Sequence, residues 1–208
     1  MAEDKTLVVI TGGTIEALYN PEEGTPYYVP VPKTASESCI PGALERLGVG
    51  TACEVYPLAM KDSKEVTTAM LDHVLAHAVT HGYKRIVMVH GTDTMPLHAR
   101  YMQRRVAEWG SEGAVDEKTF IFTGAMQPLR DKHGAWREQA DGWQNLTRAL
   151  HDAQTQPAGV YVEMGEGPWF PNEIDKFVQA GDKTPGAIVE KSGFVHVAPE
   201  RFIEHPFD

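Results

Sequence analysis

Short, apolar, β-branched runs alternate along this chain with stretches in which apolar residues recur at helical spacing. The runs predict buried strands at residues 7–11, 54–58, 85–89, 119–123 and 159–163. The helical spacing predicts helices with one buried face at residues 71–79, 101–109 and 140–153. Alternation of this kind is typical of right-handed βαβ units, so we expect an α/β fold built on a parallel sheet.

The alternation breaks in two places. Prolines interrupt residues 20–41, which we therefore interpret as a surface excursion without a regular element; long loops of this kind beside a site are often lids. Residues 165–208 are also rich in Gly and Pro, with one strand expected at 187–190 and another at 194–197. The length of 208 residues suits one large domain or two small ones, and we interpret residues 1–208 as one domain.

The excess of acidic over basic residues indicates which kinds of binding partner to expect. A formal net charge of -10, from 29 acidic and 19 basic residues, disfavours nucleic acid and anionic membranes, because both repel an acidic surface. A small-molecule substrate is the better interpretation. The sequence begins without a leader-like stretch and has no apolar run long enough to span a bilayer, so we expect a cytoplasmic protein. Cys39 and Cys53 fit reduced thiols without a catalytic role.

Two strand-to-loop signatures place threonines where open α/β sheets bind ligands. TGGTI at residues 11–15 follows the first expected strand, and HGTDT at residues 90–94 follows the third. In a flavodoxin-like strand order these strands are neighbours, so Thr14 and Thr92 would face one crevice. The second strand ends near Asp62 and Ser63. Hydroxyls, a carboxylate and small neighbours at one edge suggest acyl-transfer chemistry.

Each signature taken alone has other interpretations. A Gly-rich loop can cradle phosphate or simply make a tight turn, but no Lys follows as in a P-loop and the three-glycine dinucleotide spacing is absent. A threonine hydroxyl is a weak nucleophile and needs a base or strong acceptor nearby, for which Tyr19, Asp93 and Lys176 are the candidates. A lysine serves as a base only where burial or a neighbouring cation lowers its pKa.

Several histidines and tryptophans are interpreted as structural. Three histidines recur every fourth residue along one ridge of a predicted helix, at His73, His77 and His81. No carboxylate or cysteine is spaced to complete a metal-binding site with them, so we expect them to lie on a solvated face. His90 is interpreted as a hydrogen-bonded structural residue more than as a general base. Packing is the ordinary role for Trp136, Trp143 and Trp169.

Taken together, the motifs resemble those of the bacterial-type asparaginase/glutaminase family. They occur in the family's order over roughly residues 7–180: TGGTI at 11–15, DS at 62–63 ahead of VT at 66–67, HGTDTM at 90–95, GAMQP at 124–128, and ADG at 140–142 before NL at 145–146. The resemblance implies the three-layer, mostly parallel, flavodoxin-like sheet of the family's N-terminal domain. It also implies hydrolysis of a side-chain amide without a cofactor or metal.

The resemblance implies a role for each matching residue. Thr14 resembles the nucleophile, which attacks the side-chain amide of L-asparagine, releases ammonia and leaves an acyl-enzyme. Thr92, Asp93 and Lys176 resemble the second triad, which orients the attack and the incoming water. Main-chain amides beside Thr14 and Thr92 would form the oxyanion hole. Asp93 and Ser63 also resemble the groups that hold the α-ammonium and α-carboxylate of an amino acid.

The activating tyrosine and the remaining substrate contacts follow from the same resemblance. Tyr19 has the spacing from the nucleophile found in short members of the family, and is preferred to Tyr27 and Tyr28, whose spacing is nearer that of longer members. The substrate contacts that the resemblance implies are Gly13, Asp62, Ser63, Gly91 and Ala125.

The chain departs from familiar members in two ways. Those members add a second domain that contributes to a neighbouring subunit's site, whereas this chain resembles the short form, for which we expect a homo-oligomer, a dimer or tetramer. Gln127 replaces an Arg found in many members and touches none of the proposed chemistry. Two alternatives stay open: a non-catalytic amino-acid-binding module, and an amidohydrolase acting on glutamine or another amide. Asparagine and glutamine differ by one methylene, which sequence does not resolve.

Overall fold

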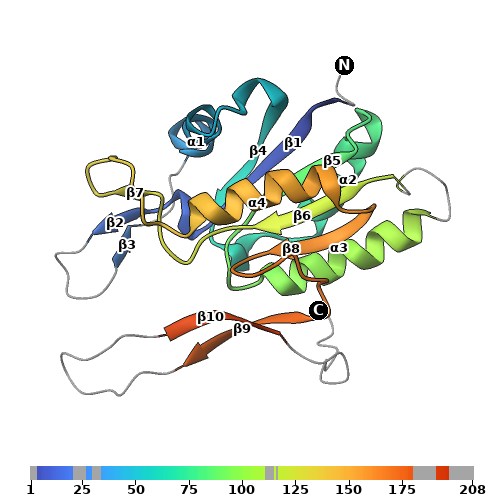
Figure 1. Ribbon diagram of the computed structural model, residues 1–208. Coiled ribbons are helices and arrows are strands. Elements are labelled where there is room, and N and C mark those ends of the chain that lie inside the picture. Colours follow the sequence, from blue (N-terminus) through green and yellow to red (C-terminus); the bar gives the residue numbers. More distant parts are fainter. Residues whose placement is uncertain are drawn as a thin grey trace.

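Five parallel strands form the central sheet of the computed structural model, in the order β4-β1-β5-β6-β8 (Figure 1). The structure describes residues 4–20, 27–29, 34–110, 115, 117–179 and 191–196. The strands are β1 (Thr6–Gly12), β4 (Cys53–Lys61), β5 (Arg85–Val89), β6 (Thr119–Thr123) and β8 (Gly159–Glu163). All five predicted strands are confirmed, and their order in space is second, first, third, fourth and fifth, which is the flavodoxin-like order.

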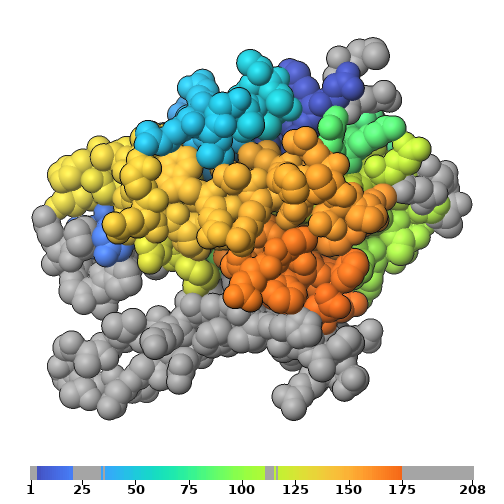
Figure 2. Space-filling model, viewed as in Figure 1, coloured from blue at the N-terminus to red at the C-terminus, as the bar shows by residue number. Residues whose placement is uncertain are grey.

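Helices cover both faces of this sheet, which gives the three layers of the expected α/β fold. One face carries α1 (Ile40–Arg46) and α4 (Gly142–Thr155), and the other carries α2 (Thr68–Thr80) and α3 (Met95–Gly110). Figure 2 shows α4, in yellow to orange, across the middle of one face of the molecule, with α1 in cyan above it. The predicted helices correspond to α2, α3 and α4.

Alternating side chains of the strands divide the core between the two faces. On β1, Val8 and Ile10 pack beneath α1 and α4, whereas Leu7 and Val9 pack against α2 and α3. Because β1 is buried on both sides, it is a continuous apolar run without polar alternation. Each such side chain contributes about 1.5–3 kcal/mol by leaving water.

Residues 20–41 contain regular elements, so the expectation of a purely irregular excursion was wrong. β3 (Tyr27–Val29) pairs antiparallel with β2 (Leu18–Asn20), which pairs parallel with β7 (Arg130–Asp131). A 3-10 helix, η4 (Ala35–Glu37), and the start of α1 follow. Proline is tolerated beside a short edge strand and in the first helical turn, where Pro41 lies. Residues 21–26 and 30–33 lie outside the described part.

A second hairpin lies in the C-terminal part of the chain, next to the main sheet (Figure 1). It joins β9 (Ile174–Gln179), which the sequence pattern did not predict, to β10 (Lys191–His196). The strand expected at 194–197 overlaps β10, and the one expected at 187–190 lies outside the described residues. The remaining short elements are η2 (Thr14–Glu16), η5 (Gly50–Ala52) and η6 (Ser63–Glu65). The one-domain interpretation of residues 1–208 stays a prediction.

Both cysteines are buried and unpaired, as expected. Desolvation raises the pKa of the Cys39 thiol, with the Glu16 carboxylate adding to the effect, and desolvation also raises the pKa of Cys53. Neither thiol is therefore a reactive thiolate. None of the helices in the described part is long and apolar enough to cross a membrane.

A carboxyl pair is buried between β8 and α4. Glu163 is fully buried, and neither of its carboxylate oxygens has a hydrogen-bond partner among the groups described; the same is true of Asp152 Oδ2. The nearest cation, Arg148 Nη1, is 3.9 Å from Glu163 Oε1. Desolvation, with the nearby carboxylate of Asp152 adding to it, raises the pKa of Glu163 to about 8. We infer that Glu163 holds a proton at neutral pH.

This pair predicts that stability falls as pH rises. The pKa of Glu163 is near 4.3 when unfolded and about 8 when folded, so its contribution is complete below the unfolded value and is lost as pH rises toward 8. Glu163→Gln keeps the uncharged form and should flatten this slope, so that its stability relative to wild type rises by about 3–4 kcal/mol between pH 5 and pH 8 in urea unfolding. The exposed Glu117→Gln is the control, and equal slopes for wild type and Glu163→Gln would contradict the raised pKa of Glu163.

Candidate active site

Three loops meet in backbone contact at the carboxyl ends of β1, β4 and β5. A Cβ added to Gly13 would lie 2.5 Å from the backbone nitrogen of Gly91, and one added to Gly91 would lie 2.7 Å from the Cβ of Ser63. Real Cβ atoms do not approach so closely, so only glycine fits at the first two positions. The contact brings the segments of Thr14 and Thr92 together at one sheet edge, as the strand order predicted.

The chain leaves β1 through an irregular turn at its two glycines. The register with β4 shifts between Ile10 and Gly12, and Gly12 and Gly13 have φ values of 106° and 90°. Gly13 N–H donates to the carbonyl of Lys61, 3.1 Å away, at the end of β4. The turn delivers Thr14, which is half-buried, to the start of η2. The paired glycines of the motif are therefore required by backbone geometry.

A buried carboxylate anchors η2 to the next helix. Glu16 is fully buried; the Ser38 hydroxyl donates to its Oε1 at 2.6 Å and Cys39 N–H donates to its Oε2 at 2.8 Å. The second bond comes from the first turn of α1, where a negative charge is favoured. Both oxygens are thus satisfied, and the segment that carries Thr14 is tied to the scaffold at two points.

A chain of buried hydrogen bonds links the Ser63 loop to the Gly91 loop. The Thr94 hydroxyl donates to the Ser63 carbonyl at 2.9 Å and lies 3.3 Å from His98 Nδ1. His98 Nδ1 lies 2.9 Å from His90 Nε2, and His90 Nδ1 lies 2.7 Å from the Gly91 carbonyl. A carbonyl only accepts, so His90 carries its proton on Nδ1 and, when neutral, accepts from His98 at Nε2.

Burial keeps both imidazoles in this uncharged form. Desolvation, with His98 adding to it, lowers the pKa of His90 to about 3, and desolvation lowers that of His98 to about 4. His90 is fully buried and has both ring nitrogens engaged, in agreement with its interpretation as a structural residue. The two rings connect the loops without adding charge to the site.

The residues expected to contact substrate differ in exposure. Ser63 and Thr92 are buried at the meeting point of the loops, whereas Asp93 is exposed and forms an ion pair with Lys64, Nζ to Oδ2 at 3.3 Å. Asp62 is also exposed, and its carboxylate caps η6 by accepting from Lys64 N–H at 2.9 Å. Asp93, the carboxylate expected to bind the α-ammonium group of a substrate, therefore already has the Lys64 ammonium beside it.

The loop after β6 is held by the start of α4. The Asp141 carboxylate accepts from the N–H groups of Met126 and Gln127, at 2.8 and 2.9 Å, and the Asn145 side chain donates to the Gly124 carbonyl at 3.0 Å. These bonds explain the paired motifs at 124–128 and 140–146. Ala125 is fully buried in the core, and its expected contact with a substrate stays a prediction.

The structure describes only part of the tyrosine and lysine candidates for catalytic groups. Tyr19 is half-buried on β2, opposite Tyr28 of β3 in the backbone register, and the guanidinium of Arg137 lies over its ring. Lys176 is on β9, and its side chain, like those of Tyr27 and Tyr28, lies outside the described part. The assignment of all three as catalytic groups stays a prediction.

Sequence reasoning missed several residues that build this edge. Glu16, Lys64, His98 and Arg137 are not part of the expected site, yet each contacts a residue or loop that is. Glu16 lies within two residues of Thr14 inside an otherwise apolar segment, which is a usable local signal. The others have no local signal, because each acts through a partner distant in sequence.

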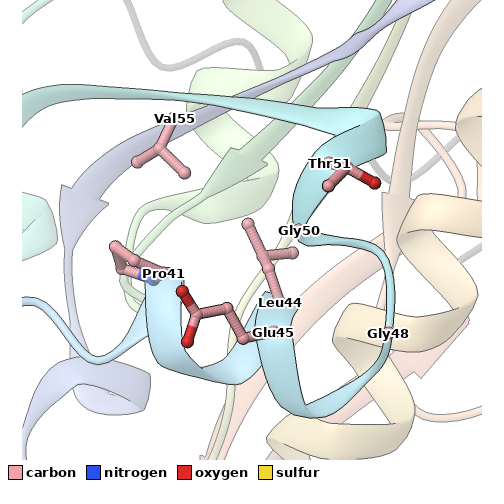
Figure 3. Close-up of a pocket in the computed structure, with 7 residues that line it drawn as sticks. All are labelled: Pro41, Leu44, Glu45, Gly48, Gly50, Thr51 and Val55. Carbon is pink, nitrogen blue, oxygen red and sulfur yellow. The ribbon is translucent and has the colours of Figure 1, made fainter.

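An open groove of about 500 Å³ lies elsewhere (Figure 3). It is lined by α1 and the start of β4, toward the amino ends of the strands and away from the Gly13 and Gly91 loops, and its residues are Pro41, Leu44, Glu45, Gly48, Gly50, Thr51 and Val55. Its few polar groups offer no nucleophile paired with a base, so we do not place the chemistry there.

The histidine ridge of α2 is more packed than expected. His77 is half-buried, its ring stacks on Tyr56 at 4.3 Å and lies 4.1 Å from His81, and desolvation lowers its pKa, with His81 and His73 adding to the effect. The interpretation as a solvated face was therefore wrong for His77. Within the described residues, no group of three or more His, Cys, Asp or Glu side chains could hold a metal ion.

Comparison with known proteins decides the family. The family model described as "Asparaginase, N-terminal" matches residues 5–180. This chain belongs to the asparaginase family. Among curated proteins, none matches the chain at a significant level.

Solved structures of L-asparaginases share the fold, each at 20% sequence identity. The probable cytoplasmic L-asparaginase of Campylobacter jejuni has a TM-score of 0.61 and aligns over 82% of this chain and 49% of its own. The thermostable L-asparaginase of Thermococcus kodakarensis has a TM-score of 0.58 and aligns over 82% of this chain and 47% of its own. L-asparaginase I of Vibrio cholerae has a TM-score of 0.63 and aligns over 92% of this chain and 51% of its own. The chain spans about half the length of these asparaginases.

The close contact of Gly13 with Gly91 predicts a large effect of a single methyl group. Gly13→Ala has to displace the Gly91 backbone and should cost several kcal/mol in urea unfolding, because overpacking against backbone does not relax by a rotamer change. Gly134→Ala is the matched control: its φ of 83° is similar, but nothing lies within 4 Å, so only the backbone strain of about 1 kcal/mol remains. Equal losses in the two variants would refute the close contact as the cause.

Proposed function

We propose that this chain hydrolyses the side-chain amide of L-asparagine to L-aspartate and ammonia through an acyl-enzyme on Thr14. The proposal is supported above all by the backbone contact of Gly13 with Gly91, which brings two threonine segments of the asparaginase motifs to one sheet edge. Membership of the asparaginase family supports the reaction class.

The reaction proceeds in two steps, acylation of Thr14 and hydrolysis of the acyl-enzyme. The Thr14 oxygen forms a bond to the amide carbon, its proton passes to the leaving nitrogen, and the carbon–nitrogen bond breaks to release ammonia. Water then attacks the resulting ester, its proton returns to the Thr14 oxygen, and aspartate leaves. Backbone N–H groups beside Thr14 and Thr92 stabilise the oxyanion formed in both steps.

The neighbouring residues supply proton transfer and orientation. Tyr19 relays the proton of Thr14, and Thr92 with Asp93 and Lys176 activates the water. Ser63 and Asp93 hold the substrate's α-carboxylate and α-ammonium, while the loop segments of Gly13, Asp62, Gly91 and Ala125 line the pocket. A fixed binding geometry matters here because orientation of the reacting groups supplies a large share of the rate enhancement. Homo-oligomerisation and a cytoplasmic location belong to the same proposal.

The Lys64–Asp93 ion pair favours a second substrate class. A lysine beside Asp93 competes with an ammonium group for the same carboxylate and offers a cation to a substrate carboxylate. An amide that carries a carboxylate but no free ammonium, such as succinamate, then becomes a candidate beside asparagine and glutamine. The pair is exposed and contributes at most about 1 kcal/mol, so an asparagine ammonium is able to displace it.

Ammonia release tests both classes. Wild type, Thr14→Ala and Thr14→Ser are assayed with L-asparagine, L-glutamine and succinamate. We expect Thr14→Ala to lose at least about a thousandfold in kcat and to keep substrate affinity, because the nucleophile is gone and the binding groups remain. Thr14→Ser should retain part of the activity, since it keeps the hydroxyl.

Exposed Thr147→Ala is the control for this series, and circular dichroism checks that each variant is folded. Wild-type turnover that survives in Thr14→Ala would overturn the nucleophile assignment. A wild type that binds asparagine in calorimetry but releases no ammonia from any of the three amides would instead identify an amino-acid-binding module.

A further inference from the structure

The guanidinium of Arg137 lies over the ring of Tyr19. Its Cζ is 3.8 Å from the ring centre, well within the distance of about 6 Å at which a cation is attracted to an aromatic face. Both residues are half-buried. They come from separate segments, since Tyr19 is on β2 and Arg137 lies in the loop between β7 and α4, so the contact depends on the tertiary fold.

Arg137 donates three hydrogen bonds that hold it in place. Its Nη1 donates to the Pro128 carbonyl at 2.9 Å, its Nη2 donates to Gln127 Oε1 at 3.2 Å, and its backbone N–H donates to the Leu129 carbonyl at 2.8 Å. The planar guanidinium therefore has a fixed orientation, with one edge in hydrogen bonds and one face toward Tyr19. Gln127, which we expected to touch none of the proposed catalytic groups, is therefore one of the residues that hold Arg137.

The β7 segment, which Arg137 contacts through its bond to Leu129, is itself bonded to the segment that carries Thr14. Leu129 N–H donates to the Ile15 carbonyl at 3.4 Å, and β7 pairs with β2 so that Leu18 lies beside Arg130 and Tyr19 beside Asp131. These contacts and the Arg137–Tyr19 contact join the loop to both η2 and β2. The Arg137–Tyr19 contact is thus part of a set of contacts that also reaches η2.

We propose that Arg137 is a positioning residue of the active site, which fixes the Tyr19 ring for proton transfer with Thr14. This proposal rests on the proposed function. In this relay the phenol oxygen of Tyr19 accepts the Thr14 proton as its own proton passes to the leaving nitrogen, so the phenol is neutral before and after the step. The net result is transfer of one proton from Thr14 to ammonia, so the arginine changes the rate and not the stoichiometry.

Steady-state kinetics of variants at Arg137 test the proposal. We expect Arg137→Met to lower kcat about 10- to 100-fold and to change KM less than about threefold, because the ring is misplaced while the substrate contacts remain. Arg137→Lys should recover only part of the loss, since lysine keeps the charge but lacks the planar face and the paired bonds.

The control is an arginine–aromatic pair on α3, for which no contact with the Arg137 segment is found in the described residues. Arg105 Cζ lies 5.9 Å from the ring centre of Trp109, and Arg105→Met should leave kcat within about twofold of wild type. In a Tyr19→Phe background, Arg137→Met should cause little further loss, because the two residues act as a unit. Full activity of folded Arg137→Met, or losses that multiply in the double variant, would overturn the proposal.

A readout independent of turnover separates this proposal from the proposed function. With tyrosine labelled at ¹³Cζ and the Tyr19 signal assigned from Tyr19→Phe, Arg137→Met should shift or broaden that signal, and Arg105→Met should not. A wild type without amidase activity would refute the proposed function alone. An unchanged Tyr19 signal in Arg137→Met would refute the positioning role, whatever the activity.

Discussion

The candidate site depends on the contact of three backbones, at Gly13, Gly91 and Ser63, where two positions have no space for a Cβ. Because the loops meet backbone to backbone, the residues that follow them are delivered to one edge without intervening side chains. This explains why glycine precedes threonine in both motifs. A larger residue would separate β1 from β5 at their carboxyl ends, where a parallel sheet opens its crevice.

Around that contact, every loop is tied to the scaffold by a buried polar group with partners. Glu16 joins η2 to α1, Asp141 and Asn145 hold the loop after β6, and the pair of His90 and His98 links the Ser63 and Gly91 loops. Burying polar groups is costly unless they are paired, so this edge is rigid only because each group is satisfied. Such rigidity is what preorganised catalysis requires.

Charge is placed at the periphery of this rigid centre. The histidines remain neutral because they are desolvated, and the carboxylate of Asp93 stands at the surface beside Lys64. The guanidinium of Arg137 lies over the Tyr19 ring. A zwitterionic substrate would therefore meet charged groups at the rim and hydroxyl and backbone groups at the centre, the arrangement that an uncharged nucleophile needs.

The apolar runs and their spacing predicted the five main strands and the helices α2, α3 and α4, since periodicity and the βαβ rule act on neighbouring residues, and the family resemblance implied the strand order. The two glycine–threonine motifs likewise predicted that the loops after β1 and β5 lie together at one edge of the sheet. The tertiary structure alone decided that β3 and α1 form inside a proline-rich stretch, that His77 is packed, and that His98 and Arg137 support the candidate site. These features arise from contacts between segments far apart in the chain, and local sequence carries no record of which partner each side chain will meet.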